Sequence, residues 1–341
     1  MSVIIGIDPH KLLHAACAID EREIELARLE VRTNSAQVSD LLSWAAPFEC
    51  RSWAIESAGG LGYLLAQQLV ARGEQVVDVP ATLSSRVRLL GSGKSTKNDA
   101  NDARAVAVAA LRAPSLAQVR VEDHVTILRL LAKAQLDTSR AKSRACCRLH
   151  ALVAELVPGG IRKEIVVKQA EQVLIDIVPT SAAQRQRLDL AYDTLSEIVM
   201  LDDRAKRNKQ RITTEVIASG TSLPGIFGVG PILAGMLIGY TGDVTRFPTP
   251  GHYAAYNGTA PVEFSSSGRT VNRLSRRGNR TLNHALHMVA VTQIRFAHSE
   301  GRGYYDRKIT EGKTPREARR ALKRQISDRV YRQLRSDIAS K

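Results

Sequence analysis

The feature that most constrains the fold is an alternation of short apolar runs and helical patterns over the first hundred residues. Runs rich in β-branched residues predict strands at Val3–Ile7, Ala15–Ile19, Ser52–Ile55 and Gln75–Val79. Apolar residues at helical spacing predict helices at Ser39–Trp44, Gly62–Ala71 and Asn98–Leu111. The glycine-containing segment Gly91–Lys97 is predicted to be a mobile loop. This alternation is typical of an α/β domain.

Two long stretches with few helix breakers follow the α/β region. Residues Glu122–Leu156 and Ser181–Ile217 are rich in Leu, Ala, Arg and Gln, and a Pro-Gly-Gly turn at 158–160 lies between them. They predict two long helices that form a helical hairpin or coiled-coil arm, an arrangement suited to dimerisation. An ordinary helical bundle is an equally good interpretation of the same pattern.

The chain changes character again after Gly220. Glycines that include Gly228 and Gly230 lie between short apolar helical patterns and predict a helix-hairpin-helix, whose turn can present backbone N–H groups to phosphates. The alternative is that these glycines only let two helices pack closely. Two further helices are predicted at Thr281–Ala297 and Pro315–Ile338. We therefore predict an α/β domain over residues 1–120, a helical arm over 121–217 and a mostly helical domain over 218–341.

The charge of the chain indicates a polyanionic partner. The formal net charge is +15, and residues 216–341 hold 20 Lys and Arg against 8 Asp and Glu. Lysine and arginine replace the counterions that condense on phosphates. Aromatic residues make up only 4% of the chain, which argues against stacking of bases on aromatic side chains. We expect the protein to grip the phosphate backbone of duplex or structured nucleic acid.

The same sequence excludes several other classes of protein. No apolar run approaches the ~18–20 residues that cross a bilayer, so no membrane partner is expected. The first ten residues lack the pattern of a signal peptide, and we expect a cytoplasmic location. The four cysteines have no CxxC spacing, which argues against a zinc ribbon and against a disulfide framework.

Four acidic residues are candidates for a metal site. Asp8 and Glu56 each follow an apolar strand, while Asp99 and Asp102 are three residues apart at a helix start and share one face. Carboxylates suit Mg²⁺ or Mn²⁺, which can polarise a phosphate. A purely structural interpretation of the helix pair is equally good: Asp99 would cap the helix, and Asp102 would interact with the helix dipole in the first turn. A carboxylate that ends a buried strand is costly without a partner, which favours a functional role for Asp8 and Glu56.

The segment Gly93-Lys94-Ser95 has the ending of a phosphate-binding loop. Arg88 occupies the position of the required glycine, and no strand immediately precedes the segment. Both departures exclude an ATP-binding P-loop.

A serine cluster, Ser265-Ser266-Ser267, lies beside a dense basic run. A serine hydroxyl can attack a phosphodiester and preserve the bond energy for rejoining, provided that it is activated and that cations stabilise the transition state. Taken alone, Ser-Ser-Ser-Gly is usually a flexible loop. The segment becomes informative in combination with the acidic residues.

The motifs in their order resemble those of the DEDD-type transposases of the insertion-sequence 110 family over nearly the whole chain. The acidic motifs are Gly-Ile-Asp8, Ile-Glu56-Ser and Asn98-Asp99-Ala-Asn-Asp102-Ala-Arg104. The motifs that follow them are Leu-Pro-Gly-Ile, Ala-Tyr-Asn-Gly, Ser-Ser-Ser-Gly and Leu-Ser-Arg-Arg-Gly-Asn. The resemblance implies an RNase-H-like N-terminal domain similar to the Holliday-junction resolvase RuvC. It also implies that the four acids bind Mg²⁺ or Mn²⁺ and that the C-terminal domain supplies a catalytic serine.

The resemblance also implies partners and further site residues. The partners are donor and target DNA, a structured non-coding bridge RNA, and further copies of the chain in a dimer or tetramer with composite sites. Relatives often have Ser-Ser-Gly-Gly at the serine. Counting from Pro261 therefore favours Ser266, counting back from Gly268 favours Ser267, and Ser265 remains a neighbouring alternative. Five arginines are expected to contact nucleic acid, namely Arg269, Arg273, Arg276, Arg277 and Arg280. A solvated basic loop would explain these arginines nearly as well.

Three functional hypotheses follow. In the leading one, the four metal-bound acids position a scissile phosphate while Ser266 attacks it, which leaves a 5′-phosphoserine and a free 3′-hydroxyl that rejoins a new partner. The rival is a junction-resolving nuclease whose acids hold two metal ions that activate water. The third is a non-catalytic scaffold that binds nucleic acid through its positive charge.

Overall fold

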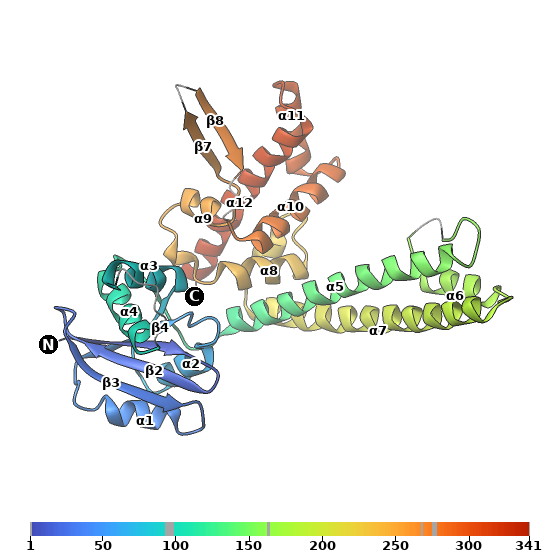
Figure 1. The fold of residues 1–341 in the computed structure, drawn as a ribbon. Coiled ribbons are helices and arrows are strands. Elements are labelled where there is room, and N and C mark those ends of the chain that lie inside the picture. Colours follow the sequence, from blue (N-terminus) through green and yellow to red (C-terminus); the bar gives the residue numbers. More distant parts are fainter. Residues whose placement is uncertain (1, 93–98, 162–163, 267–268, 275–277, 341) are drawn as a thin grey trace. The chain divides into compact units, whose positions relative to one another are not determined.

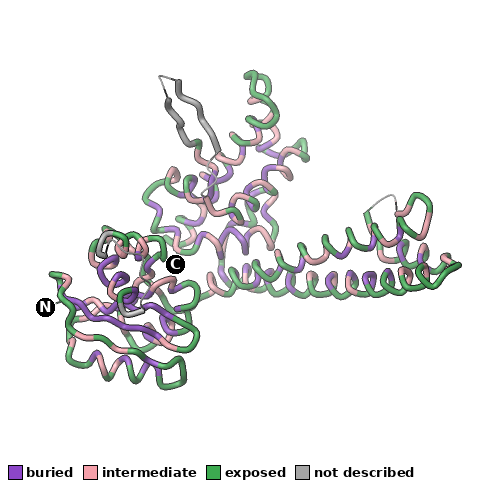
Figure 2. The backbone as a smooth tube through the Cα atoms, in the orientation of Figure 1, coloured by how far each residue is buried: buried purple, intermediate pink, exposed green. Residues whose placement is uncertain are grey.

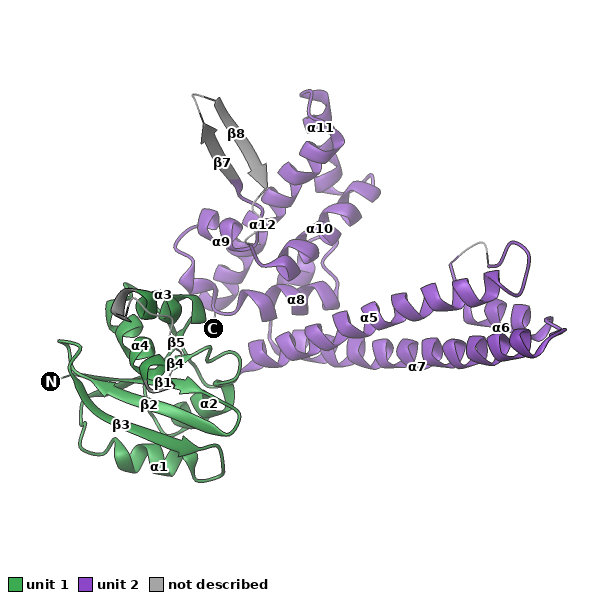
Figure 3. Ribbon diagram, in the orientation of Figure 1, with its two compact units in different colours: residues 1–122 green, residues 123–341 purple. Residues whose placement is uncertain are grey.

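A computed structural model describes the chain except at residues 1, 93–98, 162–163, 267–268, 275–277 and 341, and it leaves undescribed the side chains of 90–100 and 262–277 (Figure 1). The chain divides into two compact units, residues 1–122 and residues 123–341 (Figure 3). Among the described residues, no helix is both long and apolar enough to cross a bilayer.

The first unit is built on a six-stranded mixed sheet with the strand order β3-β2-β1-β4-β5-β6. Strands β1 to β3 are antiparallel neighbours, β4 and β5 run parallel to β1, and β6 is antiparallel to β5. The strands are β1 (Val3–Pro9), β2 (Leu13–Ile19), β3 (Glu25–Arg32), β4 (Arg51–Glu56), β5 (Val76–Val79) and β6 (Ala117–Gln118). The helices are α1 (Gln37–Trp44), α2 (Tyr63–Ala71), α3 (Ala81–Ser92) and α4 (Asp99–Arg112).

Helices cover both faces of this sheet. Ile5, Ile7 and Trp53 belong to one apolar cluster with Leu41 of α1 and Leu69 of α2. A second cluster joins small residues of β2 to α4, which packs against β1 and β2. The central strands are buried on both faces, which explains why their sequences are nearly continuous apolar runs.

The four predicted strands and three predicted helices of this unit are present, but three elements were missed. Strand β3 lies at the edge of the sheet, where charged residues interrupt its apolar pattern. Strand β6 has only two residues, and α3 has a weakly apolar sequence. The loop prediction for Gly91–Lys97 was wrong at its first two residues, which end α3, and the other five lie outside the described residues.

The second unit begins with the predicted helical hairpin, which we call the arm. It consists of α5 (His124–Ala154), α6 (Val167–Ile175) and α7 (Ala182–Ala218). Asp123 and Ser181 cap the two long helices by accepting hydrogen bonds from backbone N–H groups. Cross-helix ion pairs show that α5 and α7 run antiparallel, and they are Lys142–Asp202, Arg148–Glu197 and Arg187–Glu155. Figure 2 shows exposed residues along most of the arm.

The rest of the second unit is a mostly helical module around an apolar helix, α8. Its elements are η1 (Leu223–Gly225), α8 (Pro231–Thr241), η2 (Val244–Arg246), α9 (Pro250–Tyr256), β7 (Pro261–Ser266), β8 (Arg269–Leu274), α10 (Arg280–Arg295), α11 (Glu300–Thr310) and α12 (Pro315–Ala339). Helix α8 packs against α5, α7 and α10, so the base of the arm and this module share one core. The mixed sheet and the mostly helical remainder confirm the predicted α/β plus α class.

Candidate functional site

The register of two parallel strands brings Asp8 and Glu56 to neighbouring positions. Strand β1 pairs with β4 so that Ile7 lies opposite Ile55, and each acidic residue directly follows its isoleucine. The carboxyl ends of neighbouring parallel strands lie at the same edge of a sheet, which is a common location for functional sites in α/β domains. The predicted convergence of these two strand-end carboxylates is therefore present.

Asp102 joins them because β1 and α4 are in backbone contact. A Cβ atom placed on Gly6 would lie 2.2 Å from the Ala103 carbonyl oxygen and 2.5 Å from the Ala107 nitrogen. Only a glycine at this position allows the helix to pack so closely. Asp102, the residue before Ala103, is held next to the end of β1 with only 5% of its surface exposed.

The pKa of Asp8 depends on both of the neighbouring carboxylates. Burial, a hydrogen-bonding contact with Glu56 and the negative charges of Glu56 and Asp102 together raise the pKa of Asp8 to about 6. His10 opposes this shift, since its Nε2 atom lies 3.1 Å from Asp8 Oδ2. A buried carboxyl with two acidic neighbours is an arrangement that favours cations.

Helix α3 supplies two side chains to this cluster that sequence reasoning missed. The Ser84 hydroxyl donates a hydrogen bond of 2.6 Å to Glu56 Oε1, and Arg88 Nη1 lies 2.7 Å from Asp102 Oδ1 in an ion pair. The charges of the acidic cluster raise the pKa of Arg88, with Asp102 as the main cause. The available signal was that Ser84 and Arg88 are four residues apart, but α3 itself was not predicted.

The chemistry of this cluster suits a hard divalent cation. Asp102 Oδ1 is buried and lies within ion-pair distance of Arg88. It accepts no hydrogen bond of regular geometry, however. Asp8, Glu56 and Asp102 would supply carboxylate oxygens of the kind that Mg²⁺ and Mn²⁺ prefer. Within the described part of the chain, no three His, Cys, Asp or Glu side chains are already arranged as a metal site. Asp99 begins α4, and its side chain lies outside the described residues.

The predicted serine lies on a two-stranded hairpin in the second unit. Ser266 ends β7 and pairs with Arg269 of β8, while Ser265 pairs with Thr270. Arg273 lies opposite Val262 in the same ladder. The side chains of these residues are outside the described set, as are Ser267, Arg276 and Arg277 altogether.

A buried polar network holds the two ends of this hairpin together. Asn257 is fully buried and donates a hydrogen bond of 2.8 Å to the Ser327 hydroxyl of α12. Asn283 of α10 donates to the backbone carbonyls of Asn257 and Gly258. A Cβ atom on Gly278 would lie 2.5 Å from the Gly258 nitrogen, so the segments that lead into and out of the hairpin touch.

Basic residues surround this network. Lys323 of α12 donates a hydrogen bond of 2.7 Å to Asn283 Oδ1, and burial lowers its pKa to about 8, helped by the positive charges of Arg280, Arg319 and Arg320. These cations therefore lie close together near the base of the hairpin. Arg280, a predicted nucleic-acid contact, is exposed at the first position of α10.

The two glycines that were predicted to face phosphates have different roles in the fold. Gly228 has a φ of +86°, and a Cβ atom there would lie 3.3 Å from the Thr292 side chain. Gly230 precedes Pro231 at the start of α8 and faces open space. The element before them is a 3₁₀ helix of three residues, so the helix-hairpin-helix stays a prediction.

Comparison with protein families gives two matches that together include most of the chain. A family described as a DEDD transposase of the IS110 type matches residues 5–158, and the IS116/IS110/IS902 transposase family matches residues 221–306.

The chain is also similar to proteins of insertion elements from Streptomyces and Mycobacterium. The chain is 27% identical to an uncharacterised 44.8 kDa protein of insertion element IS116 from Streptomyces clavuligerus, over 97% of this chain and 94% of the relative. It is 25% identical to the 43.6 kDa protein of IS110 from Streptomyces coelicolor, over 98% of this chain and 94% of the relative. For an IS900 protein from Mycobacterium paratuberculosis the identity is 27%, over 97% and 95% of the two chains.

Two solved structures of RuvC from Thermus thermophilus are also similar to part of the chain. The complex with a Holliday-junction substrate has a TM-score of 0.28 and 16% identity, and it covers 35% of this chain and 100% of the solved chain. The second RuvC structure has a TM-score of 0.27 and 17% identity, and it covers 34% of this chain and 99% of the solved chain.

Proposed function

The chain belongs to the IS116/IS110/IS902 family of transposases, and from that premise we propose that it cuts and rejoins DNA through a covalent serine intermediate. The convergence of Asp8, Glu56 and Asp102 is the observation that carries the proposal. Three carboxylates from two strands and one helix are costly to place together unless a cation joins them. An α/β domain with a mixed sheet and strand-end acids also supports an RNase-H-like, RuvC-like assignment for the first unit.

The acidic residues are the proposed ligands of a divalent cation at the scissile phosphate. Asp8, Glu56, Asp102 and Asp99 would bind Mg²⁺ or Mn²⁺, which when present supplies Lewis-acid polarisation of a phosphate oxygen. Ser84 fixes the Glu56 carboxylate through its hydrogen bond. Arg88 balances part of the negative charge through its ion pair with Asp102.

Ser266 is the proposed nucleophile. Its hydroxyl oxygen forms a bond to the phosphorus of the scissile phosphodiester, and the bond from phosphorus to the 3′ oxygen breaks. The hydroxyl proton is released, and the departing 3′ oxygen takes up a proton to become a 3′-hydroxyl. The reverse sequence at a new 3′-hydroxyl rejoins DNA without loss of the bond energy. Ser267 and Ser265 are the alternatives at this position.

The partners of the reaction are also part of this proposal. Donor and target DNA are the substrates, and a bridge RNA that pairs with them supplies the sequence specificity. The acidic unit of one copy and the serine hairpin of another form each site in a dimer or tetramer. The net charge of +15 supports nucleic-acid partners.

The test is a search for a protein–DNA adduct that resists denaturation. The purified protein is incubated with Mg²⁺, the non-coding RNA that flanks its gene, and end-labelled donor and target DNA. We expect an adduct on the peptide that contains Ser266, absent in Ser266→Ala and retained in the control Ser143→Ala on the exposed side of α5. Recombination by a chain in which residues 265, 266 and 267 are all alanine would overturn the serine mechanism.

A hydrolytic junction nuclease is the second candidate, and the same acidic cluster favours it. It predicts nicked products without an adduct, lost in Asp8→Asn. A non-catalytic scaffold instead predicts that Asp8→Asn leaves every measurable activity unchanged.

A further inference from the structure

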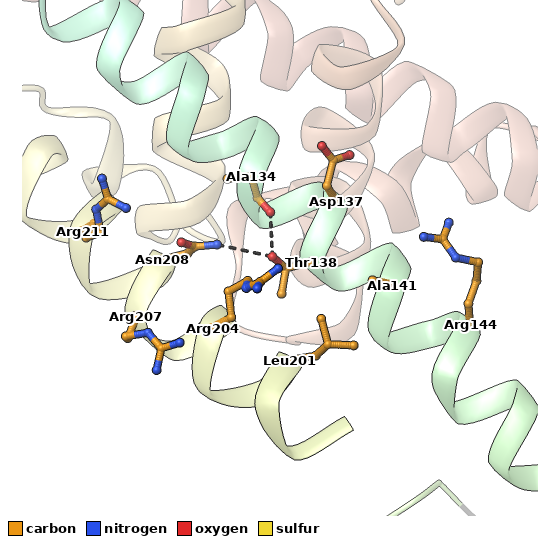
Figure 4. Close-up of a pocket in the computed structure, with 10 residues that line it drawn as sticks. All are labelled: Ala134, Asp137, Thr138, Ala141, Arg144, Leu201, Arg204, Arg207, Asn208 and Arg211. Carbon is orange, nitrogen blue, oxygen red and sulfur yellow. Dashed lines mark hydrogen bonds between the residues drawn. The ribbon is translucent and has the colours of Figure 1, made fainter. Parts of the chain in front are cut away.

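The arm contains a cavity. It lies between α5 and α7, has a volume of about 640 Å³, and is shown in Figure 4. Residues of both helices line it, namely Ala134, Asp137, Thr138, Ala141, Arg144, Leu201, Arg204, Arg207, Asn208 and Arg211. We call it the arm groove.

The arm groove exists because the apolar contact between the two helices is interrupted. Toward the base, Leu128 and Ile212 belong to the large core around α8. Toward the tip, Leu149 and Ile198 belong to a separate apolar cluster. The two clusters thus leave a stretch of the helix pair between them in which polar residues replace the apolar seam.

The floor of the groove is polar and buried. Thr138 and Asn208 are 5% and 7% exposed. The Asn208 side chain donates to the Thr138 hydroxyl at 3.5 Å, and that hydroxyl donates to the Ala134 carbonyl at 2.8 Å (Figure 4). This polar pair takes the place of apolar packing between the two helices and gives the cavity a polar floor beside the arginines.

Four arginines border this floor. No described carboxylate pairs with the guanidinium groups of these residues, which are Arg144, Arg204, Arg207 and Arg211. Closer to the tip, by contrast, Arg148 and Arg187 pair with glutamates of the facing helix. Asp137 is the one acidic side chain among the lining residues, and it is paired with Arg140 at 3.6 Å. The groove therefore has an excess of positive charge.

The spacing of the arginines fits an extended polyanion. Arg204, Arg207 and Arg211 recur every three or four residues and so share one face of α7. Seven residues of α-helix span about 10.5 Å, which is close to three base steps of about 3.4 Å each along one strand of a duplex. The lining contains no aromatic residue, which argues against stacked bases of a single strand.

We propose that the arm groove is a DNA-binding site that holds the phosphate backbone of a duplex through Arg144, Arg204, Arg207 and Arg211. This inference rests on the proposed function only in taking DNA as the substrate. Contacts to phosphates give affinity and position without base recognition. The arm thus anchors the duplex independently of the acidic cluster and of the serine hairpin.

The experiment measures equilibrium binding of the full chain to a labelled DNA duplex of arbitrary sequence, in EDTA and at several salt concentrations. The groove variant replaces Arg204, Arg207 and Arg211 by glutamine. The control variant makes the same change of charge outside the groove, at Arg148, Arg185 and Arg187, all on the arm. Loss of the control arginines leaves Glu155 and Glu197 unpaired. If only the overall charge of the arm mattered, these free carboxylates would repel DNA, and the control variant would bind DNA more weakly than the groove variant.

We expect the groove variant to bind duplex DNA about tenfold more weakly at moderate salt. The slope of the logarithm of the binding constant against the logarithm of the salt concentration should become shallower by about 2 to 3, because each lost phosphate contact contributes about 0.9. The control should bind within about twofold of the wild type. Lysine at the same three positions keeps the positive charges and should preserve most of the sequence-independent binding. This lysine variant separates loss of charge from loss of folding.

Three outcomes would overturn the proposal. A loss of binding in the control variant that equals or exceeds the loss in the groove variant would indicate a general effect of charge. A loss confined to an RNA duplex of the same sequence would assign the groove to RNA instead. Unchanged DNA binding in the groove variant would show that the groove holds no duplex. Because binding is measured in EDTA, each outcome is independent of whether the serine mechanism holds.

Discussion

The acidic cluster and the arm groove place charge in opposite ways. The acids come from β1, β4 and α4, and two of them are almost completely buried. The groove arginines come from two helices, with Arg144 on α5 and the other three at regular spacing along α7. A site for bond-making needs its groups fixed against each other, whereas a surface for a polyanion needs charge at intervals that match the phosphates. We therefore expect mutations in the two regions to separate catalysis from binding.

The largest expected effect comes from Asp8→Asn. Removing this carboxylate should reduce DNA cleavage at least about 100-fold, because transition-state charge is no longer stabilised at the scissile phosphate. The matched control is Glu30→Gln, which changes an exposed acid at the edge of the sheet and should leave cleavage unchanged. Duplex binding in EDTA should stay within about twofold for both variants. Parallel loss of binding and cleavage would break the separation between the regions.

A second substitution tests how the buried cluster is assembled. Gly6→Ala places a Cβ atom against the backbone of α4 and should lower the free energy of unfolding by about 3 kcal/mol. Gly59→Ala is the control, since a Cβ atom there meets nothing within 4 Å. Denaturant unfolding gives the stabilities, and Mn²⁺ titration followed by electron paramagnetic resonance should show weaker binding only in Gly6→Ala. A wild-type stability for Gly6→Ala would mean that β1 and α4 are not in backbone contact.

The pH dependence of stability tests the raised pKa of Asp8. Because this pKa rises from 3.8 to about 6 on folding, the folded protein holds more protons than the unfolded chain between these values. The stability contributed by protonated Asp8 is present below about pH 4 and is lost as the pH rises through about 6. In EDTA, the stability of Asp8→Asn relative to the wild type should therefore increase as the pH rises from about 4 to about 6. A difference that does not vary with pH would show that Asp8 has an ordinary pKa.

The smallest predicted effect is that of one groove arginine. Arg144 is the groove arginine supplied by α5, and Arg144→Gln should weaken duplex binding by about two- to threefold and make the salt slope shallower by about 0.9. Arg148→Gln is one helical turn away and is the natural comparison, since its guanidinium is already paired with Glu197. If both variants lose the same affinity, pairing within the arm does not decide which arginines meet DNA.

Much of the architecture was predictable because it depends on local patterns. The β-branched runs around β1 and β4 and the breaker-poor stretches of α5 and α7 appear where the sequence placed them. Strand β3 and helix α3 were missed because their patterns are weak, and with α3 the partners Ser84 and Arg88 were missed as well. The acidic residues were identified from their positions at the ends of apolar runs.

The sequence by itself determined the α/β and helical segments, the excess of positive charge and the identity of the candidate acids, because each depends on composition or on short-range spacing. Only the tertiary structure decided that Asp8, Glu56 and Asp102 meet, since this depends on strand order and on the close approach at Gly6. It also decided which of the described arginines of the arm have no carboxylate partner. The antiparallel register of α5 against α7 places glutamates opposite Arg148 and Arg187 and polar side chains beside Arg204 and Arg207, and such a register is a long-range property that no local pattern contains.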